Sequence, residues 1–218
     1  MTMPSTLAVD RYELGPIATN CYLVRASRAA NEAVVIDPGG NAAELRLELA
    51  RSGATCAAIL ITHGHWDHLV GVADLAEGTK ALVYMPEDER ALLENLPDLV
   101  PAGVVARAYT ADVFLHGDET LELSDVTFET LQVPGHSPGH VAYHADGCLF
   151  SGDVLFAGSV GRTDLPGADY EVLMQSITAV LFPLGDDKIV HPGHGPDTTI
   201  ERERTTNDFV LEYFAAKR

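Results

Sequence analysis

Residues 59–68, ILITHGHWDH, place three histidines and an aspartate directly after an apolar run. Histidine and aspartate are poor strand formers, and side chains this crowded repel one another once they are charged. His63 and His65 are two positions apart, so in an extended segment their side chains point to the same side. Asp67 and His68 follow where a helix is expected to begin. Two imidazoles on one side, and a carboxylate with an imidazole on the other, could serve two metal ions.

The remaining ligands of such a centre are expected in loops at the ends of other strands. His136 in VPGHSPGH, Asp153 in SGDVLF and His194 in HPGHG each follow β-forming residues and stand beside glycine. Any one of them alone reads as an ordinary loop residue, whereas their joint occurrence in this order favours a metal centre. Seven ligands, with Asp153 bridging, complete two sites that share one water. We expect two divalent metal ions, with zinc as the first candidate and iron or manganese also suited to imidazole.

The composition argues against several classes of partner. The chain has 218 residues, of which 32 are acidic and 14 basic, with a net charge of −18. Such a chain repels phosphate backbones and anionic lipid, so neither nucleic acid nor a membrane surface is expected as a partner. Cys21, Cys56 and Cys148 are far apart, which predicts buried free thiols in a reducing compartment. No signal-peptide pattern and no apolar run of membrane length is visible, so we expect a cytoplasmic location.

The rest of the chain alternates predicted strands and helices, which is the rhythm of an α/β fold. The expected strands are 20–26, 32–40, 56–61, 81–85, 126–133, 141–145, 148–156 and the start of 188–195. The expected helices are 41–53, with Asn41 as N-cap and Gly53 as stop, 69–78 and 169–182. The second half resembles the first, which predicts two sheets packed face to face with helices outside. No linker separates the halves, so we expect one domain over residues 1–218.

Four motifs in this order, THGHWDH, PGHSPGH, SGDVLF and PGHG, resemble the metallo-β-lactamase superfamily. Within it, segments 158–177 and 182–209 are similar to the short bacterial glyoxalase II-like (hydroxyacylglutathione hydrolase-like) hydrolases. The resemblance implies an αββα sandwich of two mixed β-sheets with outer helices. It assigns one metal to His63, His65 and His136, and the other to Asp67, His68 and His194, with Asp153 between them.

The details of the motifs narrow the activity that the resemblance implies. True metallo-β-lactamases usually have a cysteine where Asp153 stands, and the redox-active diiron relatives have a glutamate where His65 stands. Nuclease relatives add a large inserted domain and a basic surface, which this chain lacks. The resemblance therefore implies hydrolysis of a small thioester, such as the glutathione thioester S-D-lactoylglutathione. A hydroxide between the two metals would attack the thioester carbonyl, and Asp67 would bind metal and orient that hydroxide.

Arg162, in SVGRTDLPG, is the candidate substrate-binding residue. Glutathione has two carboxylates, which arginine binds in bidentate fashion, and glyoxalase II proper has a basic residue near this point. The alternative is an Arg162–Asp164 pair that only shapes the loop. Glyoxalase II proper also continues into a helical C-terminal domain that contacts glutathione. The short stretch after His194 has no room for that domain, so the natural substrate stays open.

Other functions also stay open at this point. Persulfide dioxygenases share GRTD and the fold, and use a single iron, here held by His63, His136 and Asp153, to oxidise glutathione persulfide. The sequence LPGADY and Trp66 favour the hydrolase. Lactone hydrolysis uses the same dimetal centre, and a non-catalytic domain stabilised by metal is the weakest alternative. The sequence does not indicate an oligomeric state.

Overall fold

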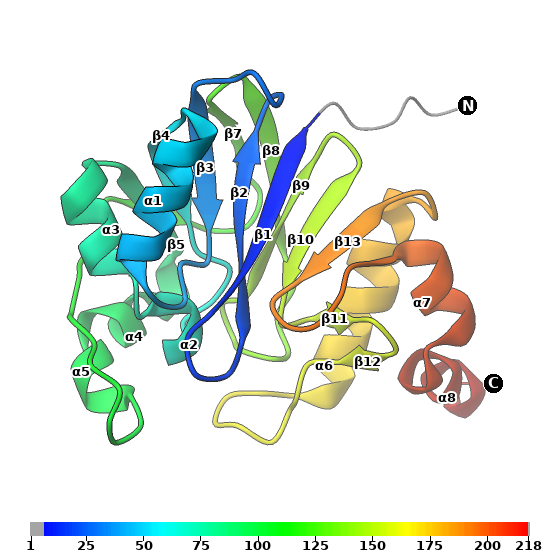
Figure 1. Cartoon of the computed structure of the whole chain (residues 1–218). Helices are drawn as coiled ribbons and strands as arrows, with labels where there is room; N and C mark the ends of the chain where they lie inside the picture. The colour runs from blue at the N-terminus through cyan, green and yellow to red at the C-terminus, as the bar shows by residue number, and fades with distance from the viewer. Residues whose placement is uncertain (1–6, 218) are drawn as a thin grey trace.

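Two six-stranded β-sheets form the centre of the computed structural model, which describes residues 7–217 (Figure 1). The first sheet contains, in order across it, β1 (Ala8–Leu14), β2 (Thr19–Arg25), β3 (Glu32–Ile36), β4 (Thr55–Leu60), β5 (Leu82–Pro86) and β6 (Val113–Leu115). The second contains β14 (Thr198–Thr199), β13 (Ile189–Pro192), β10 (Cys148–Gly152), β9 (Val141–Ala145), β8 (Val126–Gln132) and β7 (Thr120–Leu123). Each sheet combines parallel and antiparallel pairs, so both are mixed, as predicted.

Helices lie on both outer faces of this sandwich (Figure 1). On the side of the first sheet are α1 (Ala42–Ser52), α2 (Trp66–Leu69), α3 (Val72–Thr79), α4 (Arg90–Glu94) and α5 (Leu96–Leu99). On the side of the second sheet are α6 (Tyr170–Gln175), α7 (Ile200–Thr206) and α8 (Asp208–Ala216). β11 (Leu155–Phe156) and β12 (Ser159–Val160) form a short hairpin. The remaining elements are a 3-10 turn η1 (Glu87–Glu89), a π-helical segment η2 (Ser176–Leu181) that continues α6, and a 3-10 turn η3 (Phe182–Leu184).

Three apolar clusters hold these four layers together. The middle cluster joins the two sheets and includes Tyr22 and Ile36 from the first and Phe128 and Phe150 from the second. The other two clusters join each sheet to its helices. Burial of apolar side chains on both faces of each sheet explains the apolar character of the central strands, and it gives the predicted αββα sandwich.

Local sequence signals set most of the element boundaries. The side chain of Asn41 accepts the Glu44 N–H, and Gly53 ends the same helix at φ +71°, as predicted. The predicted helix 69–78 is divided between α2 and α3, because the Gly71 N–H donates to the Pro38 carbonyl (2.8 Å) instead of to a helix carbonyl. The predicted strand 148–156 is also interrupted, since the chain turns away after Gly152. That turn takes Asp153 out of the sheet.

The two sheets meet at one edge, where the loops that follow several strands come together. Strands β3, β4 and β5 run parallel, and so do β10 and β13, so the carboxyl ends of neighbouring strands share an edge. The Asn20 N–H donates to the Gly193 carbonyl (2.7 Å), and Thr19 forms an isolated bridge with His194. These contacts connect the start of β2 to the loop after β13.

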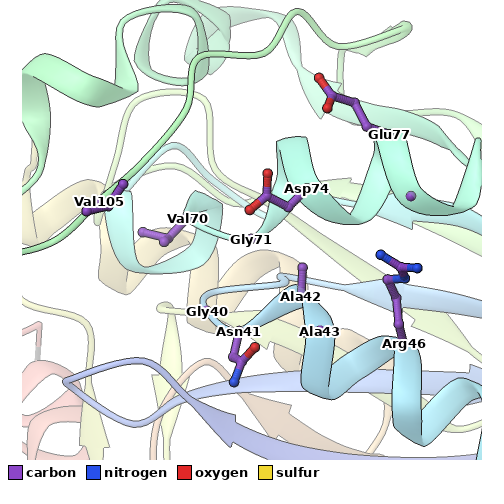
Figure 2. A pocket seen from close by; sticks show the side chains of 11 residues that line it. Gly40, Asn41, Ala42, Ala43, Arg46, Val70, Gly71, Asp74, Glu77 and Val105 are labelled. Atoms are coloured by element: carbon purple, nitrogen blue, oxygen red, sulfur yellow. The ribbon is translucent and has the colours of Figure 1, made fainter.

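A polar pocket of about 630 Å³ lies elsewhere, between α1 and α3. Figure 2 shows Arg46 on one side of it and Asp74 and Glu77 on the other. Both carboxylates are paired with Arg107. The described residues that line this pocket include no histidine or cysteine. None of the helices between residues 7 and 217 is long and apolar enough to cross a bilayer.

Candidate metal centre

The structure brings all seven predicted ligands together at the edge where the two sheets meet. Their ligand atoms form three groups, each with all atoms within 4.8 Å of one another: His63, His65 and His136; His63, His68 and Asp153; Asp67, His68 and His194. The first and third groups contain the same residues as the two sets that the superfamily pattern implies. Because the sets come from loops after β4, β8, β10 and β13, neither half of the chain forms the cluster alone.

The first set has three imidazoles whose nitrogens face one another. His65 Nδ1 lies 3.0 Å from His63 Nε2 and 2.8 Å from His136 Nε2. The opposite nitrogen of His136 donates to the Arg162 carbonyl oxygen (Nδ1–O 2.9 Å). His63 Nδ1 similarly contacts Thr62 Oγ1 (3.0 Å). These outer contacts leave the Nε2 lone pairs of His63 and His136 directed into the site.

The second set combines one aspartate with two imidazoles. Asp67 Oδ2 lies 3.3 Å from His68 Nε2 and 3.2 Å from His194 Nε2. Asp153 stands between the sets, since its Oδ2 is 3.5 Å from His136 Nε2 and 3.6 Å from His194 Nε2. A carboxylate in this position can contact a cation in either set.

Two buried polar atoms lack a partner where a cation would sit. His68 Nε2 and Asp153 Oδ1 are buried without a hydrogen bond, and they lie 3.4 Å apart. Buried polar atoms are nearly always paired, so this gap indicates a missing ligand. Gly193 keeps the gap open, because a Cβ there would lie 2.1 Å from Asp153 Oδ1. Imidazole and carboxylate donors suit divalent zinc, iron or manganese, so the residues present fit two such ions.

The electrostatics favour the metal-binding forms of His63, His65 and Asp153, whereas nearby carboxylates outweigh burial and raise the pKa of His68 and His194. Those two imidazoles would therefore lose a proton when a metal binds. Burial, together with neighbouring imidazoles, lowers the pKa of His63 well below its usual value and that of His65 to about 4. Burial alone would raise the pKa of Asp153, but the imidazoles of His68, His194 and His136 outweigh it and hold that pKa well below its usual range. Neutral imidazoles and ionised carboxylates are the ligand forms of these side chains.

Residues 14–194 match the family model of the metallo-beta-lactamase superfamily. The chain belongs to this superfamily. A relative named "Hydroxyacylglutathione hydrolase GloC", from Haemophilus influenzae, is 36% identical over 88% of this chain and 92% of its own length. "Probable metallo-hydrolase YqgX" from Bacillus subtilis is 35% identical over 92% of this chain and 96% of its own.

Solved structures of the superfamily share the architecture. The structure titled BLEG-1 B3 metallo-beta-lactamase has a TM-score of 0.87 and 40% identity, covering 93% of this chain and 99% of that one. TTHA1623 in a di-iron-bound form has a TM-score of 0.83 and 39% identity, covering 92% and 100%. ETHE1 from Myxococcus xanthus has a TM-score of 0.77 and 28% identity, covering 94% and 85%.

Behind the superfamily ligands lies a layer of hydrogen bonds, in which the sequence did not point to Asp37 or Thr19. Buried Asp37 accepts the Thr62 N–H (2.8 Å) and the Thr62 hydroxyl (2.7 Å), and His68 Nδ1 donates to it (2.9 Å). Thr19 donates to Asp67 Oδ2 (2.7 Å). His140 accepts the Asp153 N–H through Nε2 (3.1 Å). Asp37 could have been found, because it follows an apolar strand and precedes Pro-Gly-Gly, much as the ligands stand beside glycine.

Glu89 is a second residue that the sequence did not reveal. Its carboxylate is buried, with 1% of the residue exposed. Oε2 accepts the Gly64 N–H (3.0 Å) and Oε1 accepts the Gly139 N–H (2.8 Å). One side chain therefore connects the loop of His63 and His65 to the loop that follows His136. The sequence PEDER around Glu89 resembles an ordinary solvated charge cluster, so no local signal marks it.

An open pocket of about 730 Å³ lies in front of the metal ligands. Arg162 is part of its lining, as the prediction of a substrate-binding role requires. Its guanidinium also forms the alternative ion pair, with Nε and Nη2 each 2.7 Å from the Asp164 carboxylate. The loop-shaping pair is thus present, and contact between Arg162 and substrate stays a prediction.

His191 lies on β13 but outside the cluster. Its ring stacks on Phe150 with centroids 5.0 Å apart, and its Nδ1 is 3.2 Å from the Asp197 carboxylate. Burial lowers the pKa of His191, but Asp197 outweighs this and raises it to about 9. His191 is therefore a packed, ion-paired residue rather than part of any of the three ligand groups.

Proposed function

We propose that this chain is a dimetal hydrolase that cleaves a small-molecule thioester. S-D-lactoylglutathione is the first candidate substrate, since one relative is named hydroxyacylglutathione hydrolase. The observation that carries the proposal is the pair of ligand sets with Asp153 between them. Zinc is the expected metal, and the di-iron form of a similar structure keeps iron as the alternative.

The mechanism follows from what the residues do around the ions. When bound, the two ions supply a water molecule that is deprotonated near neutral pH and a Lewis acid for the developing oxyanion. Thr62 and the Arg162 carbonyl fix the ring orientation of His63 and His136. Thr19 holds Asp67, whose carboxylate orients the attacking water. Addition of the water oxygen to the carbonyl carbon would form the new C–O bond, and the C–S bond would break as the carbonyl re-forms. The products would be the carboxylate and a thiolate, which can leave without a general acid because thiols are acidic.

The second ligand set separates this proposal from the main alternative. A persulfide dioxygenase centre needs one iron on His63, His136 and Asp153, and gives Asp67, His68 and His194 no ligand role. The close approach of those three side chains therefore favours the hydrolase. Lactone hydrolysis would use the same two sets, and a similar structure bears a β-lactamase title, so both substrates belong in the test.

The test is thiol release from S-D-lactoylglutathione by metal-loaded protein, compared with Asp153→Ala. The matched control is Asp186→Ala, which removes an exposed aspartate outside the cluster. We expect about two metal ions per wild-type chain, thiol release, and loss of both in Asp153→Ala only. Parallel assays measure oxygen uptake with glutathione persulfide, lactone opening and β-lactam opening. Activity in one of these without thiol release would replace the thioesterase proposal.

A further inference from the structure

The pocket in front of the metal ligands has an apolar wall. Ligands from both sets lie at its base, and the wall includes Ile17, Trp66, Leu92, Leu99, Phe156 and Leu165. These residues come from the β1–β2 turn, α2, α4, α5, β11 and the loop after β12. Six separate segments thus contribute large apolar side chains to one surface beside the reaction centre.

Part of this wall is exposed to solvent. Ile17 is 50% exposed and Leu99 is 45% exposed, although both are large aliphatic residues. Apolar surface kept exposed at the mouth of a concave site is typical of ligand-binding walls, because a bound apolar group removes it from solvent. A volume of about 730 Å³ is also larger than the lactoyl group needs.

The wall offers little to a charged ligand. Among the described residues that line the pocket, Arg162 is the only lysine or arginine, and two of its nitrogens already contact Asp164. Glutathione has two carboxylates, and the chain as a whole has a net charge of −18. The charged thiol half of a glutathione thioester therefore finds a single arginine that is already ion-paired, whereas an aliphatic acyl group finds a continuous apolar wall.

We infer that this pocket binds the acyl group of the substrate and selects an uncharged, apolar acyl chain of several carbons over the lactoyl group. The inference rests on the proposed thioester hydrolysis and names its substrate class. Each methylene buried against the wall should raise kcat/KM about fourfold. The thiol half then lies toward solvent, so its charges matter little.

A thioester series tests the preference directly. The substrates are S-acetyl-, S-butanoyl-, S-hexanoyl- and S-D-lactoylglutathione, with the hexanoyl thioester of N-acetylcysteamine as the uncharged-thiol comparison. From acetyl to hexanoyl, we expect kcat/KM to rise about 250-fold if all four added methylenes are buried and at least tenfold if two are, with lactoyl below hexanoyl. The two hexanoyl thioesters should agree within about threefold. Equal rates across the acyl series, or a loss of more than tenfold with N-acetylcysteamine, would overturn the inference.

Two exposed leucines give a matched pair of variants. Leu99 lies on the pocket wall and is 45% exposed, whereas Leu211 on α8 is 44% exposed and lies outside the wall. Leu99→Ser should lower kcat/KM for the hexanoyl thioester about threefold to fivefold more than it lowers kcat/KM for the acetyl thioester. Leu211→Ser should change neither. An unchanged hexanoyl-to-acetyl ratio in Leu99→Ser would contradict the assigned wall.

Binding without turnover separates this inference from the proposed function. Trp66 is the single tryptophan of the chain and lines the pocket, so its fluorescence reports occupancy. The probes are the thioethers S-methylglutathione and S-hexylglutathione, which cannot be hydrolysed. At least tenfold tighter binding of the hexyl thioether supports the apolar site, even if no thioester is cleaved and the hydrolase proposal fails. Equal binding of the two thioethers rejects the site, even if thioesters are cleaved.

Discussion

Replacing Glu89 by glutamine should weaken both the fold and the first ligand set. The wild-type carboxylate accepts one backbone N–H from each of two loops. Glutamine keeps one acceptor oxygen, but its NH₂ group then faces the other backbone N–H. Gly64 or Gly139 is left as a buried donor without an acceptor.

The size of the effect follows from these two bonds. A hydrogen bond to a charged group contributes about 1.5–3 kcal/mol, and an unpaired buried donor costs a similar amount. We expect Glu89→Gln to lose about 2–3 kcal/mol of unfolding free energy, and Glu89→Ala about 4 kcal/mol. Because Gly64 lies between His63 and His65, the freed loop should also lower metal affinity about tenfold or more.

The assay combines denaturant unfolding with a metal competition against a chelator of known affinity. Glu87→Gln is the matched control, since Glu87 belongs to the same turn but its side chain is 46% exposed. That variant should change the unfolding free energy by less than about 0.5 kcal/mol. If Glu89→Gln behaves like Glu87→Gln in both measurements, the carboxylate does not hold the two loops, and the reasoning is refuted.

Three further predictions concern the cluster and its surroundings. Gly193→Ala should reduce the number of bound metal ions, measured by elemental analysis, because the new Cβ would lie 2.1 Å from Asp153 Oδ1. Gly185→Ala, at a remote turn, should not reduce that number. Chelation should lower the melting temperature of the wild type, since it leaves His68 Nε2 and Asp153 Oδ1 unpaired; an unchanged melting temperature would show that no metal was bound. Asp197→Asn should destabilise the chain by about 1–2 kcal/mol near pH 6. The raised pKa of His191, about 9, would by itself imply a larger loss, but the Asp197 side chain is half-exposed and solvent screens its charge. Since the pKa of His191 is raised in the fold, this contribution is complete below pH 6.5 and fades as the pH rises through 9, so unfolding curves at pH 6 and pH 10 should show the difference shrink.

The sequence predicted the sandwich and the ligand cluster because both depend on local patterns. Apolar runs predict the buried strands, and histidines beside glycine at strand ends mark the positions where side chains converge. Glu89 was missed for a physical reason, whereas Asp37 has a local signal in the strand before it and the Pro-Gly-Gly after it. An acidic residue in a turn has the same local sequence whether it is solvated or buried against backbone N–H groups, and only the tertiary fold separates the two.

The pocket wall was also beyond the reach of sequence patterns. Ile17, Leu99 and Phe156 lie far apart along the chain, and each alone is an ordinary apolar residue in a loop or short element. Their common surface exists only once the sheets have packed and the loops at the shared edge are fixed. The interruption after Gly152 is similar, because the strand pattern of 148–156 continues through the turn.

The division of ligands between the two halves has a consequence for the order of events during biosynthesis. His63, His65, Asp67 and His68 leave the ribosome first, but the two sets lack His136 and His194 until those residues have been made. A nascent chain that ends between His136 and His194 contains all three imidazoles of the first set but only part of the second. In the proposed dimetal enzyme, loading of both ions is therefore a late step of maturation. Products of premature termination should contain at most one tightly held ion.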